Sequence, residues 1–266
     1  MKRFFVFAVV AALSAVSAFA DAVTLNKRSD WSKHPHMKIV DGNILEFRGG
    51  RVDVFSTPFV IEPGKKYIFS AEFRNKPGTP AGVIYIGNWS MRGSWRLIPE
   101  NVLFVKNSDA KVLEDAAANS NTIVIAKPAC WTAKGVQRTW NLAVNTQGDF
   151  SDLPNKNIYR IDKAQVEGDR VIITLKTKLT AAVKANSNVR LHNSSVGMYG
   201  GASNVTPTEE WQRVGWSVSN IAPLGSNPAN QWWAGADKGA IRIIANYKKT
   251  QGASLQVRNV TMEVAE

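Results

Sequence analysis

The sequence predicts an all-β protein, built as a β-sandwich with a small β insert in its middle third. Three observations lead to this prediction. The apolar runs are short and rich in β-branched and aromatic residues, which favour strands. Glycine, proline and asparagine separate these runs at close intervals, as turns do. Only 109–118 and 178–186 have a composition that suits a helix, and both are short.

The first half of the predicted sandwich contains a regular series of strands. The predicted strands are 43–47, 51–56, 66–74 and 82–88. Within 66–74, the residues Tyr67, Phe69 and Phe73 alternate with more polar side chains. A period of two is typical of a strand that buries one face. The turn signals between the strands are Gly49-Gly50 and 63–65.

The last third repeats this pattern. Its predicted strands are 211–219, 240–248 and 254–264. In 211–219, Trp211 and Trp216 point to opposite faces of the strand, and we expect Trp216 to lie in the core. In 254–264 the apolar positions change phase between Val257 and Val260. This change predicts a bulge near Arg258-Asn259.

The middle third has shorter apolar runs and a clear hairpin signal. Residues 160–179 form two apolar runs around Glu167-Gly168-Asp169, which predicts two strands joined by a turn. We therefore expect four parts. They are a leader at 1–20, the first half of the sandwich at 21–106, a β-rich insert at 107–192 and the second half of the sandwich at 193–266.

The first twenty residues have the pattern of a secretory signal peptide. Lys2 and Arg3 precede an apolar run, and Ala18-Phe19-Ala20 forms a signal-peptidase site before Asp21. Loss of Lys2 and Arg3 lowers the formal net charge from +12 to +10. No later segment is long and apolar enough to cross a membrane. We expect a protein that is secreted, periplasmic or on the cell surface.

Composition excludes several kinds of chemistry. One cysteine excludes an intrachain disulfide or a cysteine-ligated zinc site, and three histidines leave little material for a metal centre. We expect no cofactor. The basic balance of the chain suits nucleic acid, a membrane or an acidic polymer, and it is compatible with an acidic glycan without requiring one. Its positive charges are dispersed rather than gathered in a polybasic run, which together with the leader counts against nucleic acid.

Four segments carry a resemblance to a known family. They read YIFSAEFR after PGK, EEWQRVGWSVS, IRIIANY and SLQVRNVTMEV. This pattern, over 31–106 and 194–264, resembles jelly-roll carbohydrate-binding modules of the galactose-binding-like group. The resemblance implies a jelly-roll sandwich that binds a polysaccharide or glycan without catalysis. Where that group often carries an acidic pair, this chain has Arg258-Asn259-Val260, so no calcium site is inferred. The insert resembles small β inserts in large secreted bacterial proteins that act on polysaccharides.

The tryptophans suggest how a sugar would be held. A pyranose ring stacks on a flat aromatic face, and amides, acids or arginine bind its hydroxyl groups. Several tryptophans lie beside such polar residues in glycine- and asparagine-rich segments. The predicted ligand-binding residues are Trp89, Arg92, Trp95, Arg96, Tyr199, Asn230, Trp232 and Trp233. The alternative is that one tryptophan of each pair packs beneath its loop, as large aromatic residues usually do.

Two other functions remain open at this point. His192 with Arg190 and Tyr199 is a cluster that a polysaccharide lyase acting on an anionic glycan could use. A structural or adhesive surface subunit would instead use the tryptophan pairs at its interfaces. Asp149 and Asp152 flank Phe150 in a polar loop, where we expect them to cap turns. Glycan binding without catalysis is the function that we favour.

Overall fold

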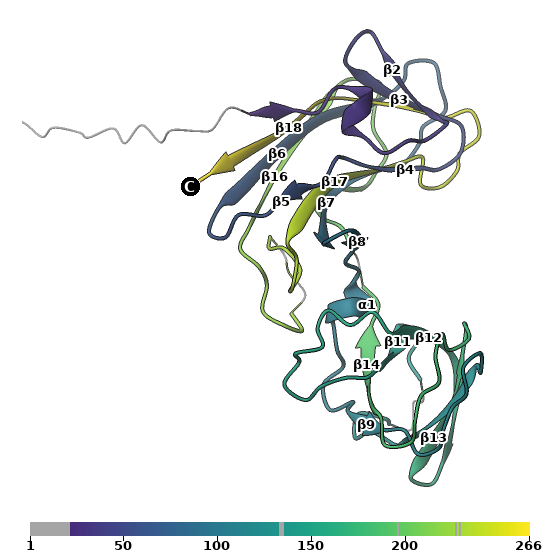
Figure 1. Ribbon diagram of the computed structural model, residues 1–266. Helices are drawn as coiled ribbons and strands as arrows, with labels where there is room; N and C mark the ends of the chain where they lie inside the picture. Colours follow the sequence, from purple (N-terminus) through teal and green to yellow (C-terminus); the bar gives the residue numbers. More distant parts are fainter. Residues whose placement is uncertain (1–21, 133–135, 196, 227, 229) are drawn as a thin grey trace, which may run out of the picture.

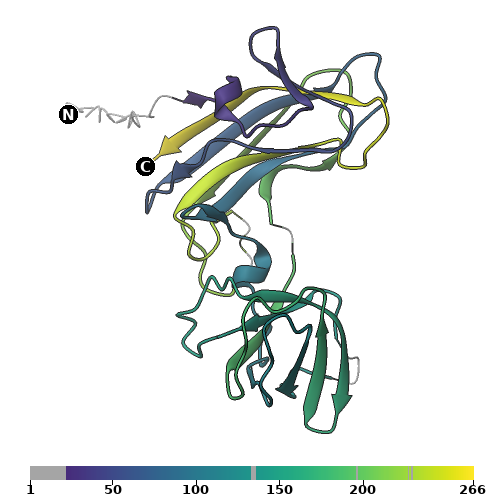
Figure 2. The ribbon, with the colours of Figure 1, turned by 45° about the vertical axis from the view of Figure 1, so that its right-hand side comes forward.

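The computed structural model describes residues 22–132, 136–195, 197–226, 228 and 230–266. The predicted leader at 1–20 lies outside the described residues. The predicted all-β class is confirmed: in the described part of the chain, strands dominate and the helices are single turns. Figures 1 and 2 show two bodies, a sandwich built from both ends of the chain and a smaller body built from its middle. None of the described residues forms a helix long and apolar enough to span a membrane.

The first sheet of the sandwich is antiparallel and runs in the order β16-β6-β18-β3-β2, with β1 paired to β18. Its strands are β16 (Gln212–Ser219), β6 (Lys66–Asn75), β18 (Ser254–Ala265), β3 (Ile44–Arg48), β2 (Met37–Val40) and β1 (Val23–Thr24). The pairing of β18 with β6 shifts register between Arg258 and Thr261, so the predicted bulge is confirmed. Asn259 adopts a positive φ of 49° there.

The second sheet runs in the order β15-β7-β17-β4, with β5 paired to β17 and β8 paired to β7. Its strands are β15 (Tyr199–Val205), β7 (Ile84–Arg92), β17 (Lys238–Ala245), β4 (Val52–Phe55), β5 (Phe59–Val60) and β8 (Trp95–Arg96). Val54, Ile86 and Ile243 point into the core between the sheets. Because strand side chains alternate, Phe55 and Arg242 lie on the outer face.

Aromatic rings fill the space between the two sheets. Phe69 stacks on Trp216 with ring centroids 5.2 Å apart, and it meets Trp232 edge-on at 6.4 Å. Trp216 is 9% exposed, in accord with its predicted place in the core. Trp232 packs so closely on β17 that a Cβ atom at Gly239 would lie 2.6 Å from its ring. Only glycine fits at that position without displacing the ring.

The middle of the chain folds into a closed barrel with its own core. Its strands, in sheet order, are β10 (Thr122–Ala126), β13 (Arg170–Leu175), β12 (Ile158–Glu167), β11 (Trp140–Val144), β14 (Asn188–Asn193) and β9 (Ala110–Lys111). A bridge between Val112 and Ile125 joins the two ends of this sheet. The predicted hairpin around Gly168 is present as β12 and β13. We call this body the barrel.

The two stretches with a helical composition form no helix. Val112 bridges to Ile125, and Ala116 bridges to Val183, so backbone pairing takes the place of helical hydrogen bonds. Both pairs bury apolar side chains in the barrel core. Tertiary pairing overrides local propensity here.

One segment closes an open side of the sandwich. It begins with the 3₁₀ turn η1 (Arg28–Asp30) and continues through Trp31, which bridges to Ser56 beside the edge strand β4. It then enters β2, the edge strand of the first sheet. The segment therefore connects the edges of the two sheets and presents its polar side chains outward.

The single helical turn α1 (Pro99–Val102) leads from β8 into the barrel. The two chain segments at this junction are hydrogen-bonded to each other, because Asn193 N donates to Leu103 O at 2.8 Å. Asn101 reaches across to the barrel and donates to Asn155 O at 2.8 Å. The barrel is thus attached where the chain leaves and rejoins the sandwich.

Candidate ligand-binding site

The tryptophan pair at the end of the predicted site lies inside the protein. Trp232 is 0% exposed and Trp233 is 1% exposed, so neither ring can present a face to a sugar. The loop that carries them turns inward, with Trp232 N donating to Asn220 O at 2.9 Å and Trp233 N to Ser90 Oγ at 3.0 Å. The prediction that these rings form a stacking platform is wrong, because both rings are packed in the hydrophobic core.

Trp89 lies on the outer face of the second sheet, yet it is only 6% exposed. Phe55 meets its ring edge-on at 5.7 Å, and Arg242 lies 4.2 Å from its centroid. Gly197 approaches it so closely that a Cβ atom there would lie 2.8 Å from the ring. These neighbours exclude a sugar, so the prediction of direct stacking on Trp89 is also wrong. Trp89 instead packs against Phe55 and Arg242.

The remaining predicted residues do not gather in one place. Trp95 and Arg92 lie near the barrel: Lys156 Nζ is 4.5 Å from the Trp95 ring, and Arg92 packs beside Gly235. Asn230 is exposed and accepts a backbone hydrogen bond from Ser219 at 3.0 Å. Tyr199 begins β15 opposite Asn88, and its side chain lies outside what the structure describes. A single eight-residue site is therefore not formed.

Arg96 belongs to a compact cluster on the outer face of the second sheet. Its guanidinium lies 3.6 Å from the centroid of Phe55, and Arg242 lies 5.1 Å from the same ring. Arg242 also binds Asp53 through two hydrogen bonds of 2.8 and 2.6 Å. Burial and the neighbouring Arg242 lower the pKa of Arg96, and Asp53 opposes this. An arginine remains charged at neutral pH all the same.

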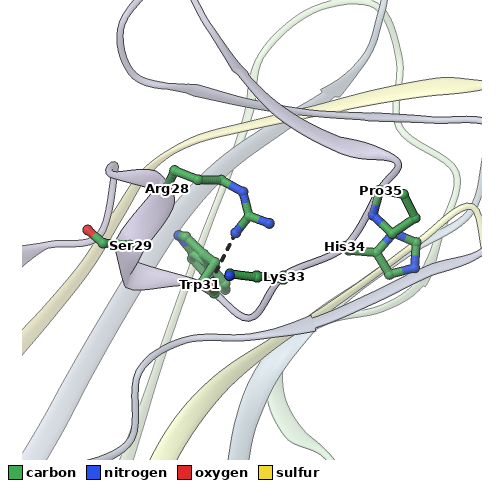
Figure 3. A pocket seen from close by; sticks show the side chains of 6 residues that line it. All are labelled: Arg28, Ser29, Trp31, Lys33, His34 and Pro35. Carbon is green, nitrogen blue, oxygen red and sulfur yellow. Dashed lines mark hydrogen bonds between the residues drawn. The ribbon is translucent and has the colours of Figure 1, made fainter.

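A pocket of about 500 Å³ adjoins this cluster (Figure 3). It lies on the segment 28–35, which connects the edges of the two sheets. Its lining consists of Arg28, Ser29, Trp31, Lys33, His34 and Pro35. Trp31 is buried beneath it and donates from Nε1 to Leu25 O at 3.1 Å. Arg28 Nη1 donates to Trp31 O at 3.1 Å and to Ser32 O at 3.2 Å, which fixes the turn. The lining thus carries basic side chains and no carboxylate.

His34 adds a hydrogen-bond donor to this pocket. Its Nδ1 accepts from His36 N at 3.2 Å, so the proton of the neutral ring resides on Nε2. Burial, followed by the nearby His36, lowers the pKa of His34. Asp53 acts in the opposite direction. At neutral pH the ring is therefore an uncharged donor in a pocket that Arg28 and Lys33 also line.

The pocket and the arginine cluster form one surface. Ser32 pairs with Phe55 through two hydrogen bonds, Ser32 N to Phe55 O at 2.8 Å and Phe55 N to Ser32 Oγ at 3.0 Å. Asp53 is near enough to influence the pKa of both His34 and Arg96. We define the basic face as Arg28, Lys33, His34, Asp53, Phe55, Trp89, Arg96 and Arg242. Its four cations outnumber its one carboxylate.

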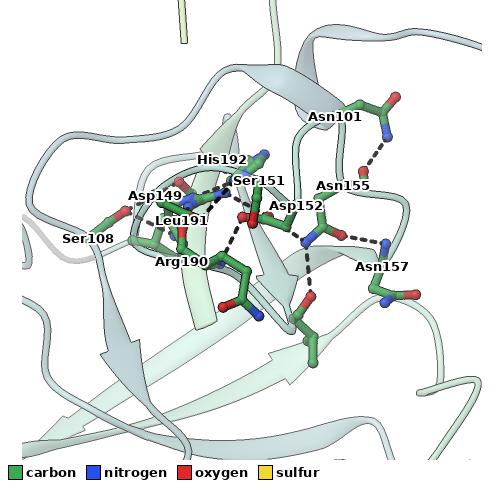
Figure 4. Close-up of polar contacts among 12 residues, drawn as sticks. Asn101, Ser108, Asp149, Ser151, Asp152, Asn155, Asn157, Arg190, Leu191 and His192 are labelled. Carbon is green, nitrogen blue, oxygen red and sulfur yellow. Dashed lines mark hydrogen bonds and ion pairs between the residues drawn. The ribbon is translucent and has the colours of Figure 1, made fainter. Parts of the chain in front are cut away.

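A second polar cluster lies inside the barrel at its junction with the sandwich (Figure 4). Arg190 is 0% exposed and binds Asp152 Oδ2 at 2.9 Å. Arg190 Nε also donates to His192 Nε2 at 3.1 Å, and His192 Nδ1 then donates to Glu100 O at 2.5 Å. Burial lowers the pKa of His192 to about 4. We call these residues the buried cluster.

The buried cluster bears on the lyase alternative. His192 and Arg190 are both 0% exposed, and each already donates to a protein acceptor. A base that no polymer can reach cannot abstract its proton, so this pair does not form a lyase site. Asp149 and Asp152 accept the backbone N–H groups of Ser151 and Gln147, as expected of residues that cap turns. Among the described residues, no three metal-ligating side chains are grouped to hold a metal ion.

Sequence reasoning missed most of the basic face. It found Trp89 and Arg96 but not Phe55 or Arg242, whose strands give only the ordinary alternating pattern. The useful signal was weak: Phe55 and Arg242 occupy outward positions of strands that become neighbours only in the folded sheet. Lys27-Arg28 is a basic pair, but Lys33 is five positions beyond Arg28, and so short a group does not indicate a pocket.

Comparison with known proteins gives no assignment. No protein-family model matches this chain, and no curated protein matches its sequence.

Proposed function

We propose that this protein binds an acidic polysaccharide at the basic face, outside the cell, without transforming it. The observation that carries the proposal is the pocket of about 500 Å³, whose lining includes Arg28 and Lys33 and no carboxylate. Pockets of this volume suit small organic groups such as one sugar unit with its acidic substituent. Guanidinium and ammonium groups are the usual partners of carboxylate and sulfate.

The arginine cluster beside the pocket supports the same class of ligand. Arg96 is exposed and lies over the ring of Phe55. Its hydrogen-bond donors are more available to a ligand than those of Arg242, which bind Asp53. An arginine held against an aromatic ring is oriented, so it loses less freedom when it binds an anion. Trp89 and Phe55 act here as a support for the two guanidinium groups rather than as the sugar platform.

The direct test measures binding to a panel of polymers. Polygalacturonate and dextran sulfate carry carboxylate and sulfate groups, dextran is neutral, and a DNA duplex offers phosphate without sugar carboxylates. We expect binding to at least one acidic polysaccharide, an affinity that falls as salt concentration rises, and no binding to dextran. Equal or tighter binding to DNA would instead identify a nucleic-acid-binding protein. Binding to dextran alone, or to none of these polymers, would overturn the proposal.

Variants locate the site. The double variant Lys33→Gln with Arg96→Gln removes two exposed charges from the basic face. Because a basic residue near an anionic surface contributes about 1 kcal/mol, we expect affinity to fall roughly tenfold or more. The matched control is Lys163→Gln with Lys178→Gln, which removes two exposed charges from the barrel. Equal losses in both double variants would show that only net charge matters and would remove the site assignment.

A further inference from the structure

We infer that the ligand is bound as an extended chain, along a track that leaves the pocket and follows β2 and β3 onto the outer face of the first sheet. This inference rests on the proposed function and extends it, because it states that the protein contacts several units of the polymer rather than one. It depends on two further hollows that adjoin the pocket and on the charges that line them.

The three hollows follow one another because each shares a lining residue with the next. Pro35 lines both the first pocket and a second hollow of about 220 Å³, which also includes His36 and Lys38. Arg48 lines that second hollow and a third one of about 360 Å³, which continues to Lys76. The three hollows are therefore neighbours, and their order runs from the segment 28–35, over β2 and β3, to Lys76 and Gly252.

The charge along this track is one-sided. Lys38, Arg48 and Lys76 line the second and third hollows, and Glu46 is the one carboxylate among the lining residues. Glu46 is 3% exposed and accepts hydrogen bonds from Lys76 Nζ at 3.0 Å and from Gln256 Nε2 at 2.8 Å, and it also forms an ion pair with Arg48 Nε. Burial would raise the pKa of Glu46, but these hydrogen bonds outweigh burial and lower it. Its one negative charge is shared by Arg48 and Lys76, so the three cations leave the track with a net positive charge, and Lys38 and the 62% exposed side chain of Arg48 lie on its surface.

The backbone holds the track in a fixed shape. His36 O accepts from Arg48 N at 3.0 Å, and β2 pairs with β3 from Met37 opposite Phe47 onward. The ring of His36 packs directly on Gly49, where a Cβ atom would lie 3.2 Å from Nδ1. Outward residues of paired strands keep regular spacings, which matches a polymer with a repeating anionic group better than it matches one isolated anion.

The experiment compares short and long forms of the same ligand. Size-fractionated oligomers of galacturonate and of dextran sulfate, from trimers to long chains, are titrated into the full chain. We expect the affinity per molecule to rise with oligomer length until the track is filled, because each added unit gains contacts without a second loss of translational freedom. Affinity that is the same for trimers and long chains would overturn the extended track and leave the pocket as the whole site.

Variants at the far end separate this inference from the proposed function. Lys38→Gln with Arg48→Gln removes two exposed charges from the second and third hollows. We expect about tenfold weaker binding of long chains and unchanged binding of trimers, whereas Lys33→Gln with Arg96→Gln weakens both. Circular dichroism and thermal unfolding check that Lys38→Gln with Arg48→Gln leaves the fold intact. If far-end variants bind long chains normally, the track is wrong; if no acidic polymer binds at all, the proposed function itself fails.

Discussion

The buried cluster of the barrel and the basic face of the sandwich are made of the same kinds of side chain. Each contains an arginine bound to an aspartate, aromatic rings beside the guanidinium, and a histidine. They differ in solvent exposure. Arg190 is 0% exposed, whereas Arg96 is exposed. The difference shows which groups have interactions left for a ligand.

In the buried cluster every charged group has its partners. Arg190 donates to Asp152, to His192 and, from Nη1, to Gln147 O at 3.1 Å, while Phe104 and Phe150 stack 4.4 Å apart beside it. On the basic face, Asp53 pairs with Arg242 and, at 3.4 Å, with Arg51, whereas no ion pair joins Arg28, Lys33 or Arg96 to a carboxylate of the described residues. The first arrangement stabilises the fold, and the second attracts an anion. Four predictions test this contrast, beginning with the largest expected effect.

Removal of Asp152 tests the buried cluster. Asp152→Ala leaves Arg190 buried without its counter-charge, and we expect the free energy of unfolding to fall by about 3–5 kcal/mol in chemical denaturation. Asp115→Ala breaks the exposed Lys184–Asp115 pair of the same barrel and serves as the control, with little change expected. Asp152→Leu with Arg190→Met replaces the pair by apolar groups and should recover most of the loss. Equal effects of Asp152→Ala and Asp115→Ala would contradict this account.

The pH dependence of stability follows from His192. Its pKa is about 4 in the folded protein and about 6.5 when unfolded, so the unfolded state binds more protons between these values. Stability is therefore complete above pH 6.5 and declines as pH falls toward 4, by about 3 kcal/mol in total. His192→Gln keeps one donor and one acceptor but does not titrate. Denaturation across this range should show a flatter profile in His192→Gln; parallel profiles would refute the assignment.

Asp53→Asn tests the balance of charge on the basic face. The ion pair with Arg242 is partly exposed, at 15% and 30% for the two side chains, so we expect a stability loss below about 1 kcal/mol. The affinity for dextran sulfate should rise several-fold, because one negative charge is lost beside four cations. Isothermal calorimetry and thermal unfolding measure the two effects. An unchanged or weaker affinity would show that Asp53 positions Arg242 more than it opposes the ligand.

Arg96→Gln gives the smallest effect on stability. The side chain is exposed, and its contact with Phe55 contributes about 0.5–1 kcal/mol. We expect thermal unfolding close to that of the parent protein and several-fold weaker binding of acidic polysaccharide. Arg160→Gln, on an exposed position of β12, is the matched control for loss of one arginine. A large loss of stability in Arg96→Gln would show that Arg96 stabilises the fold, as the buried cluster does.

The sequence predicts the class of the fold well, because alternation along a strand is a local property. The bulge at Arg258-Asn259 and the core position of Trp216 follow from that alternation, and the structure agrees with both. The burial of Trp232 could not be predicted in the same way. Its glycine- and asparagine-rich neighbours indicate a loop, but they do not indicate whether the loop turns outward or inserts between two sheets.

The candidate site was less predictable for a related reason. Phe55 and Arg242 are 187 residues apart in sequence and become neighbours only because β4 pairs with β17. Arg28 and Lys33 become part of the same surface because Trp31 bridges to Ser56. No pattern within one segment reports such pairings. The jelly-roll resemblance and secretion remain predictions, and the binding experiments described above test glycan binding.

The hydrogen bond between Asn193 and Leu103 at the junction has a consequence for folding. Strands β6 and β7 must pair with strands that follow the barrel in sequence. If the barrel were unfolded, this pairing would have to close a long flexible loop, which costs conformational entropy. Barrel contacts are more local, and local contacts form faster. We expect the barrel to fold first and bring its two ends together. The sandwich then assembles around a short closed loop. The barrel, which is inserted in the sequence of the sandwich, would thus act as a nucleus for the folding of the sandwich.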